Sequence, residues 1–225
     1  MTPDGPWKQI CETVHKQRAM RKVADSTVRR LSLYLRFLDD FEGQGVETVS
    51  SEALAQRGGT TSAQVRKDLS FFGSFGKRGL GYYVPELAQR LRQILGLGRR
   101  YRVAMIGAGK IGSALVQYRG FKQRGFDIVA IFDNDPSKIG TQWNGLTVLP
   151  IDRLEQELKS QQVDMAVLVT PGDAAQSVAE RVVGQGVKAI LNFAPIQLNV
   201  PDDVVVKTVN LALELETLSY ALANR

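Results

Sequence analysis

The spacing of apolar residues changes in character near residue 98. Before it, apolar positions recur every three or four residues, as on one side of an α-helix; after it, apolar runs of strand length alternate with helical stretches. The chain is long enough for two small domains, each with its own core. We therefore predict a polar, solvated extension over residues 1–24, a helical domain over 25–98, a sheet domain over 99–207 and a final helix over 208–225.

The helical domain opens with two predicted helices. The first begins at Asp25 or Ser26, either of which is a suitable N-cap, and Gly43 stops it. The second begins in the Ser-Ser pair at 50–51 and turns Leu54 inward. The inward stripe of the first helix consists of Val28, Leu31, Leu35 and Leu38.

A third helix begins at Thr61, whose spacing to Gln64 is that of a capping box. Its apolar stripe is Val65, Leu69 and Phe72. Two short helices joined by a tight turn predict a helix-turn-helix. The segment "SFGKRGLGYYV" follows and predicts a basic hairpin, the wing of a winged helix. The outward polar residues are Gln64, Arg66, Lys67 and Ser70 on the helix and Lys77 and Arg78 at the hairpin tip.

These outward residues are suited to binding DNA. Arg66 and Lys67 can reach guanine edges or phosphates in the major groove. Lys77 and Arg78 match the negative potential of the minor groove. The alternative is a small helical subdomain with a solvated basic face. The order of the elements, the hairpin and the charge agree with DNA binding, which is our prediction.

Net charge is unevenly distributed along the chain. Residues 1–100 hold 17 Lys and Arg against 10 Asp and Glu, whereas residues 101–225 hold 12 against 13. A basic first part fits a polyanionic partner, although a solvated basic face with a disordered tail would give the same count. The single cysteine excludes an intrachain disulfide and a CxxC metal or redox pair. With neither a signal peptide nor a membrane span in the sequence, we expect a cytoplasmic protein.

A helix opened by Pro85 and ended by Gly96 is expected to link the two domains. Beyond it, strands alternate with helices, which predicts a doubly wound parallel sheet of the Rossmann type. The expected helices are Ile111–Arg119, Asp152–Lys159 and Ala174–Val183. The expected strands are Val103–Ile106, Asp127–Phe132, Leu146–Leu149, Asp164–Val169, Lys188–Leu191 and Val204–Lys207.

A glycine-rich segment follows the first of these strands. It reads Gly107, Ala108, Gly109, Lys110, Ile111 and Gly112, the GxGxxG pattern of dinucleotide-binding proteins. Its glycines allow a tight turn, a close approach to a pyrophosphate and close helix–strand packing, while the helix N-terminus favours an anion. Asp133 ends the second strand, where a carboxylate accepts hydrogen bonds from a ribose and repels a 2′-phosphate. We predict NAD(H) binding; a glycine turn with a helix-capping Asp is the weaker alternative.

Residues suited to hydride-transfer chemistry are scarce in the sheet domain. The only histidine and the only cysteine lie in the N-terminal extension. Tyr118 and Lys122 have the YxxxK spacing of short-chain dehydrogenases, but they fall at the end of the helix that the glycine loop opens, far upstream of that family's pair. No substrate domain follows the sixth strand, so we predict no catalysis. An oxidoreductase with an accessory DNA-binding domain and a ligand-gated interaction protein remain the rival hypotheses.

The final helix, Leu211 to Leu222, is amphipathic, with apolar residues at 211, 215, 218 and 222. Such a helix caps its own sheet or packs against a partner chain. Readers of the major groove of this type normally work as symmetric dimers on palindromic sites. We therefore favour a homodimer bound to a double-stranded operator.

Four segments, "SAQVRKDLSFFGSFGKRGLGY", "GAGKIGSAL", "IFDND" and "ILNFAP", closely resemble those of the Rex family of bacterial redox-sensing transcriptional repressors. The likeness runs from about Val28 to the C-terminus. It implies a homodimer of winged-helix and Rossmann subunits that represses genes while NADH is scarce. It further implies that NADH binding moves the subunits off the operator, and that the terminal helix is exchanged between subunits and lies against the partner's two domains.

The resemblance also implies roles for single residues. The outward residues of the third helix and hairpin would read DNA, and the glycine loop with Asp133 would hold the dinucleotide. Where family members commonly have an aspartate that pairs with an arginine of the N-terminal domain, this chain has Asn210, and the matching arginine is Arg36. An amide can hydrogen-bond Arg36 but carries no charge, so the strength of that latch is left open. Around the nicotinamide end or the dimer cleft would lie Tyr118, Thr170, Pro171, Asn192, Phe193, Ala194 and Pro195.

Overall fold

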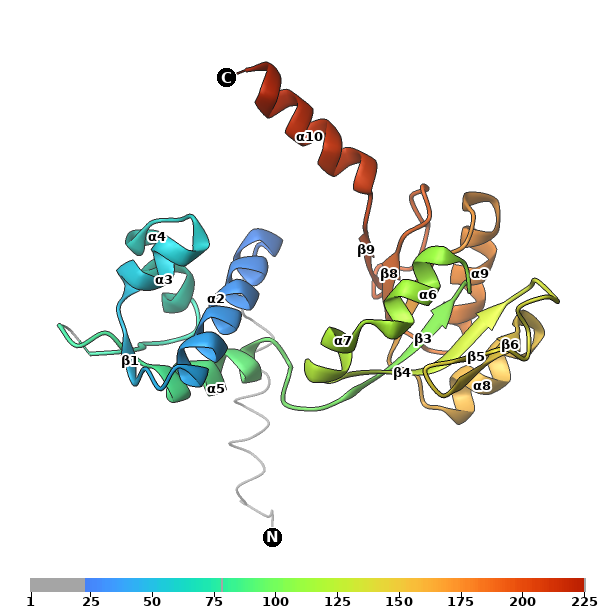
Figure 1. The fold of residues 1–225 in the computed structure, drawn as a ribbon, viewed down its shortest axis with the longest axis horizontal. Coiled ribbons are helices and arrows are strands. Elements are labelled where there is room, and N and C mark those ends of the chain that lie inside the picture. Colours follow the sequence, from blue (N-terminus) through green and yellow to red (C-terminus); the bar gives the residue numbers. More distant parts are fainter. Residues whose placement is uncertain (1–22, 78, 225) are drawn as a thin grey trace, which may run out of the picture. The chain divides into compact units, whose positions relative to one another are not determined.

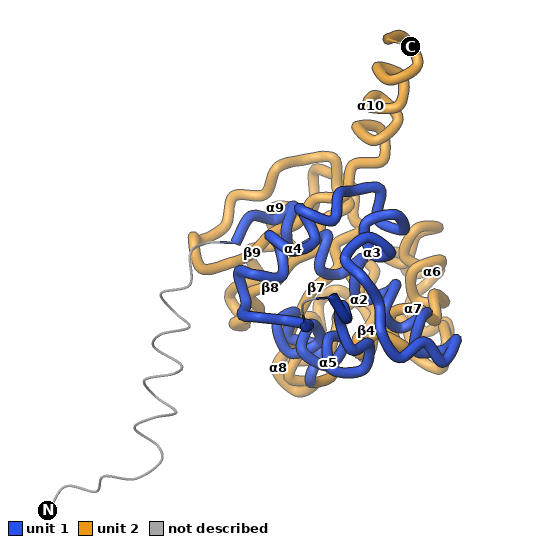
Figure 2. Tube along the Cα trace, turned by 90° about the vertical axis from the view of Figure 1, so that its left-hand side faces the viewer, with its two compact units in different colours: residues 1–98 blue, residues 99–225 orange. Residues whose placement is uncertain are grey.

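The chain forms two compact units, Met1–Gly98 and Arg99–Arg225, in a computed structural model that describes residues 23–77 and 79–224 (Figures 1 and 2). Each unit has its own hydrophobic core. Nearly all of the expected N-terminal extension lies outside the described residues. Among the described helices, none is both long and apolar enough to cross a bilayer.

The N-terminal unit packs its helices around a single core. In chain order its elements are α2 (Asp25–Gly43), β1 (Thr48–Val49), α3 (Ser51–Gly58), α4 (Ser62–Ser70), β2 (Tyr82–Tyr83) and α5 (Val84–Ile94). Every described helix contributes to the core: Leu31, Leu35 and Leu38 from α2, Leu54 from α3, Val65 and Leu69 from α4, and Leu87 and Leu91 from α5. The helix opened by Pro85 is therefore part of this core, and it is also the last element before the second unit begins at Arg99.

Two of the three predicted helix caps are confirmed. Ser50 and Thr61 each accept a hydrogen bond from the backbone N–H three residues on, at 3.1 Å in both cases. The cap expected at the start of α2 is wrong, because the N-cap is Ala24, which makes no side-chain bond. Val28 is also 40% exposed, so the buried stripe of α2 begins at Leu31.

The wing is built differently from the predicted hairpin. Its arms meet in one antiparallel bridge, between Lys77 and Gly81. The strand after it, β2, pairs with β1, a strand that the apolar pattern did not predict. Gly81 makes this pairing possible, because its φ is +87° and a Cβ there would lie 2.5 Å from the Val49 carbonyl oxygen. Arg78, at the predicted tip, lies outside the described residues.

The C-terminal unit is a seven-stranded sheet with helices on both faces. The strand order is β5-β6-β4-β3-β7-β8-β9, and all neighbours are parallel except the edge strand β5. Its elements are β3 (Tyr101–Ile106), α6 (Lys110–Gln117), α7 (Arg119–Gln123), β4 (Phe126–Asp133), β5 (Gln142–Trp143), β6 (Leu146–Pro150), a 3₁₀ turn (Ile151–Arg153), α8 (Leu154–Ser160), β7 (Met165–Leu168), α9 (Gly172–Gly184), β8 (Ala189–Asn192), β9 (Val205–Thr208) and α10 (Leu211–Ala223). All six predicted strands are present.

Alternation along the central strand divides the sheet between two layers. Ala104 and Ile106 of β3 face the layer of α8 and α9, while Val103 and Met105 face the layer that includes α6. The predicted helix over Ile111–Arg119 is shorter than expected. It ends at Gln117, since Tyr118 has an extended backbone (ψ 105°), and α7 begins one residue later.

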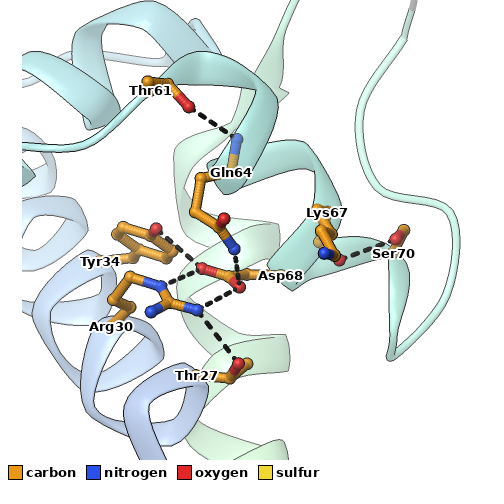
Figure 3. A network of polar contacts seen from close by, with 8 residues as sticks. All are labelled: Thr27, Arg30, Tyr34, Thr61, Gln64, Lys67, Asp68 and Ser70. Atoms are coloured by element: carbon orange, nitrogen blue, oxygen red, sulfur yellow. Dashed lines mark hydrogen bonds and ion pairs between the residues drawn. The ribbon is translucent and has the colours of Figure 1, made fainter.

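A buried carboxylate fastens α4 to α2 (Figure 3). The Asp68 side chain is 1% exposed and accepts two hydrogen bonds from Arg30, through Nε at 2.6 Å and Nη2 at 2.7 Å. The Tyr34 hydroxyl donates to it at 3.0 Å and the Gln64 amide at 2.8 Å. A buried charge is costly unless it is paired and hydrogen-bonded. The hydrogen bonds from these donors compensate the buried charge of Asp68. Because Arg30 and Tyr34 belong to α2, the orientation of α4 depends on α2.

We expect Asp68→Ala to destabilise the N-terminal unit by about 3 to 5 kcal/mol, because it leaves Arg30 without its partner. Tyr34→Phe should cost about 1 kcal/mol, the value of one hydrogen bond. Hydrogen exchange of the α4 amides in the full chain measures both. Ser70→Ala is the control, since the Ser70 hydroxyl bonds only to the Lys67 carbonyl of its own helix. An Asp68→Ala cost no larger than that of Ser70→Ala would contradict the role of the network.

The same network makes the stability pH-dependent. Burial alone would raise the pKa of Asp68, but the hydrogen bonds from Arg30, Gln64 and Tyr34 outweigh it and hold the pKa below its ordinary 3.8. A carboxyl group whose pKa is lower in the folded state stabilises the fold above its unfolded pKa and loses this effect as the pH falls through the folded pKa. We expect the α4 amides to lose protection below about pH 4 in the wild type. In Asp68→Asn this part of the pH dependence should be absent.

Candidate functional sites

The glycine loop joins β3 to α6 through close backbone contacts. Gly107 has a φ of +109°, and a Cβ there would lie 2.5 Å from the Val169 carbonyl oxygen. A Cβ on Gly112 would lie 2.1 Å from the Gly107 carbonyl oxygen. Both positions therefore exclude any side chain. Gly109 is the N-cap of α6, and a Cβ there would have no atom within 4 Å, so the space in front of the helix N-terminus is open.

Asp133 holds this loop in place from the neighbouring strand β4. Its side chain accepts a hydrogen bond from the Ala108 N–H at 2.6 Å and another from the Asp135 N–H at 2.8 Å. The Lys138 ammonium lies 3.4 Å from the same carboxylate. A carboxylate has about four lone-pair sites, so Asp133 keeps capacity to accept about one more hydrogen bond, such as that of a ribose hydroxyl. The residue thus has a structural task in addition to the predicted one.

A cleft of about 540 Å³ opens beside the loop. Five of the predicted cofactor residues line it: Gly107, Gly109, Asp133, Thr170 and Pro171. The Thr170 hydroxyl oxygen is buried and has no hydrogen-bond partner among the described residues. Buried polar atoms are rarely left unsatisfied. The open space at Gly109 and this unused hydroxyl fit an extended polar ligand such as a dinucleotide.

Two cationic residues in the cleft were missed from the sequence. Lys138 lies between Asp133 and Asp135, and although burial lowers its pKa, the pairing with these carboxylates outweighs burial and raises it. Arg181 of α9 is paired with Glu155, lowering the pKa of that carboxyl to about 2. Lys138 follows the predicted Asp133 within one short turn, so its position was accessible to sequence reasoning. The ion pair of Arg181 with Glu155 joins two helices that are distant in sequence, so it could not be predicted from the sequence.

The remaining predicted cofactor residues are not among those that line this cleft. Tyr118 is 58% exposed at the junction of α6 and α7, with its ring against Phe121. Phe193 is half-buried and packs in the core layer that includes α6. Lys110 and Ile111 are exposed on the first turn of α6, and Ala108 is buried in the loop. The cleft therefore brings together residues expected at the shared part of a dinucleotide and two of those expected near its nicotinamide end or the dimer cleft, Thr170 and Pro171. Tyr118, Asn192 and Phe193 do not line it.

Asn192 has a structural task. Its side-chain amide donates to the carbonyl oxygens of Ala194 at 3.2 Å and Ile196 at 2.9 Å, and its oxygen accepts from the Ala194 N–H at 2.9 Å. It is fully buried. All its strong donors are used, so Asn192 shapes the turn after β8 that carries Phe193.

The predicted DNA readers share the exposed side of α4 only in part. Arg66 and Lys67 are exposed, and the Arg66 guanidinium donates to the Ser51 hydroxyl of α3 at 2.9 Å. Lys77 is exposed on the wing. Ser70 is exposed, but its hydroxyl donates back to Lys67. Gln64 does not simply point outward, because its amide is drawn in by Asp68.

The two residues of the expected latch are both at the surface. Arg36 is exposed on α2. Asn210 is the N-cap of α10, where its side-chain oxygen accepts hydrogen bonds from the backbone N–H groups of Ala212 at 3.0 Å and Leu213 at 3.3 Å. In the described parts of the chain, no group of three or more His, Cys, Asp or Glu residues could hold a metal ion.

Comparisons with known proteins match both units. Residues 99–196 match the family model of the CoA binding domain, and residues 22–70 match that of the putative DNA-binding protein N-terminus. The redox-sensing transcriptional repressor Rex of Carboxydothermus hydrogenoformans is 50% identical over 199 residues, covering 88% of this chain and 96% of the relative. Rex of Desulfitobacterium hafniense is 46% identical over 204 residues, covering 91% and 97%.

Solved structures give the same result. The crystal structure of RSP in complex with beta-NADH has a TM-score of 0.82 and 38% identity, covering 91% of this chain and 96% of that one. That of RSP in complex with beta-NAD+ and operator DNA has a TM-score of 0.86 and 39% identity, covering 91% and 94%.

Two glycine substitutions separate folding from ligand binding. Gly112→Ala should destabilise the C-terminal unit by about 1 to 3 kcal/mol, because its Cβ overlaps the Gly107 carbonyl oxygen. Gly109→Ala should cost less than about 1 kcal/mol, since only open space surrounds its Cβ, yet it should weaken NADH binding at least about tenfold by filling that space. Thermal unfolding and a fluorescence titration with NADH measure the two effects. Full NADH affinity in Gly109→Ala would contradict the placement of the ligand.

Proposed function

Because this chain belongs to the Rex family of redox-sensing transcriptional repressors, we propose that it represses transcription by binding operator DNA while NADH is scarce, and that NADH releases it. The observation that carries the proposal is the presence in one chain of a basic winged helix and a dinucleotide cleft. The first supplies a surface for DNA, and the second supplies a site for the ligand that is sensed. The dinucleotide is then a signal and not a substrate.

On this proposal, the glycine loop and Asp133 hold the parts that NADH and NAD⁺ have in common. They bind both forms nearly equally, and a ligand that binds two states equally shifts neither. Discrimination falls to residues near the nicotinamide, which is cationic when oxidised and neutral when reduced. Apolar side chains such as Phe193, together with Tyr118, would disfavour the cation by desolvation. A nearly complete switch requires about 5 kcal/mol of differential binding.

We further propose that a second copy of the chain covers α10. Six large apolar side chains of this helix are between 56% and 71% exposed: Leu211, Leu213, Leu215, Leu218, Tyr220 and Leu222. Four of the six lie on one side of the helix, and Leu213 and Tyr220 lie on the opposite side. A helix that is apolar on opposite sides is normally buried. The sheet also has an apolar hollow of about 300 Å³ between α7 and the strands β3, β7, β8 and β9. A dimer contains two copies of α4, and a palindromic operator offers two half-sites for them. We propose that the dimer works in the cytoplasm.

Gel shifts on promoter DNA with NADH, with NAD⁺ or without cofactor test the main proposal. We expect a shift without cofactor and with NAD⁺, and its loss with NADH. A shift that is insensitive to NADH would contradict the redox switch. Net oxidation of NADH in a turnover assay with candidate small substrates would favour an oxidoreductase instead.

The surface that meets DNA is tested by charge removal. Arg66→Ala should weaken operator binding at least about tenfold and reduce the slope of log K against log salt by about 0.9, as for the loss of one phosphate contact, or relax specificity at one base if Arg66 reads a guanine. NADH affinity should stay normal. Arg90→Ala is the matched control, because it removes an exposed arginine of the same unit from α5 instead of α4. Equal losses in the two variants would contradict the proposed orientation.

Dimerisation through α10 is tested by placing charge in its apolar surface. Leu215→Glu together with Leu218→Glu should convert a dimer into a monomer in sedimentation experiments, because the interface would bury two unpaired carboxylates. Glu216→Gln, on the same helix, should leave the dimer intact. A double variant that stays dimeric would show that another surface joins the subunits.

A further inference from the structure

Asp133 has less capacity to bind a ribose than its place at the end of β4 suggests. Of the about four lone-pair sites of a carboxylate, three are used. Oδ2 accepts from the Ala108 N–H at 2.6 Å and from the Lys138 ammonium at 3.4 Å, and Oδ1 accepts from the Asp135 N–H at 2.8 Å. The adenosine ribose of a dinucleotide has two hydroxyl groups, at C2′ and C3′. One of them therefore needs a partner other than Asp133.

Lys138 can supply this partner. It lines the same cleft as Asp133, and its side chain is 35% exposed. An ammonium group has three N–H donors, of which Asp133 takes one and Asp135, with Oδ2 at 3.3 Å, takes another. Burial lowers the pKa of Lys138, but the two carboxylates outweigh burial and raise it, so the group keeps all three protons at neutral pH. One donor is left for a ligand.

The turn that carries Lys138 is braced by its own polar groups. The Asp135 carboxylate accepts hydrogen bonds from the N–H of Ser137 at 2.9 Å and from its hydroxyl at 2.7 Å. The Lys138 N–H donates to the Asp135 carbonyl oxygen at 3.0 Å. These bonds hold the ammonium beside the Asp133 carboxylate before any ligand arrives, and such preorganisation lowers the entropic cost of binding.

The other cationic residue of the cleft is less suited to this task. The Arg181 guanidinium is held by both oxygens of Glu155 and by the Ile151 carbonyl oxygen at 2.9 Å. These partners follow β6, the strand next to β4. Lys138, in contrast, contacts the Asp133 carboxylate itself. A ribose bound to Asp133 therefore meets Lys138 first.

We propose that Lys138 is a further dinucleotide-binding residue, which donates a hydrogen bond to one hydroxyl oxygen of the adenosine ribose while Asp133 accepts one from the other hydroxyl. The pair offers an acceptor and a donor side by side, which matches a vicinal diol. This inference rests on the proposed function, because it assumes that the cleft binds NADH. NADH and NAD⁺ share this ribose, so Lys138 contributes to the affinity for both and not to the discrimination between them.

A binding titration of the full chain with two ligands tests the contact. One ligand is NADH, and the other is the analogue of NADH whose adenosine lacks both ribose hydroxyl groups. Lys138→Met should weaken NADH binding about tenfold, the value of a hydrogen bond to a charged group. It should weaken binding of the analogue less than about threefold, because only a screened attraction to the pyrophosphate is then lost.

The difference between the two ligands identifies the contact. A residue that only stabilised the turn would lower the affinity for both ligands by the same factor. Lys188→Met is the matched control, because Lys188 pairs with Asp203 at 2.7 Å in the same unit and is not among the residues that line the cleft. It should leave both affinities unchanged.

Chemical labelling of the unaltered chain gives a second measurement, which does not depend on the folding of a variant. Reductive methylation modifies accessible lysine amines, and mass spectrometry reports its rate at each lysine. Saturating NADH should slow the methylation of Lys138, because the ribose occupies its remaining donor, and the saturating analogue should slow it less. Methylation of Lys188 should be the same with and without NADH.

The outcomes that overturn the inference differ from those that overturn the proposed function. If the wild type binds no NADH, the proposed function fails and the inference with it. If the wild type binds NADH, equal losses for the two ligands in Lys138→Met overturn the inference alone. The same holds if the wild type binds the analogue as tightly as NADH, if NADH leaves the methylation of Lys138 unchanged, or if Lys188→Met weakens NADH binding as much as Lys138→Met.

Discussion

Each unit of this chain organises its working surface around one buried carboxylate that must be compensated. Asp68 joins α4 to α2, and Asp133 joins the glycine loop to β4. In both cases the cost of removing a charge from water is met by donors that belong to the functional element itself or to its support. If these donors moved, the buried carboxylate would lose its hydrogen bonds or become exposed to solvent. This requirement keeps a helix of nine residues and a short loop in fixed positions.

Much of this arrangement follows from local rules and was predictable. The caps at Ser50 and Thr61, the spacing of the loop glycines and the strand length of the apolar runs each depend on a few neighbouring residues. The parallel sheet then brings the ends of β3, β4 and β7 to one edge. That geometry explains why Gly107, Asp133 and Thr170, far apart in sequence, line one cleft.

The parts that were missed depend on contacts between distant segments. The wing strand β2 pairs with β1, which is only two residues long and has no recognisable pattern. Gln64 was expected to point outward because of its position on the helix, but Asp68 draws its amide inward. In the sequence, Asp68 looks like an ordinary polar helix residue. Its buried role becomes visible only in the fold, which brings Arg30, 38 positions earlier, into contact with it. Helical periodicity predicts which side of a helix is buried, but not which hydrogen-bond donors of other helices it contacts.

The exposed apolar surface of α10 also makes the state of the protein depend on its concentration. If a second copy covers the six exposed side chains, as we propose, the covered fraction rises with the concentration of the chain itself, because covering them is an association step. At low abundance a larger share of chains keeps this surface open, and an open apolar patch invites aggregation and non-specific contacts. On the proposed dimer, halving the supply of the chain would lower the amount of dimer by more than half.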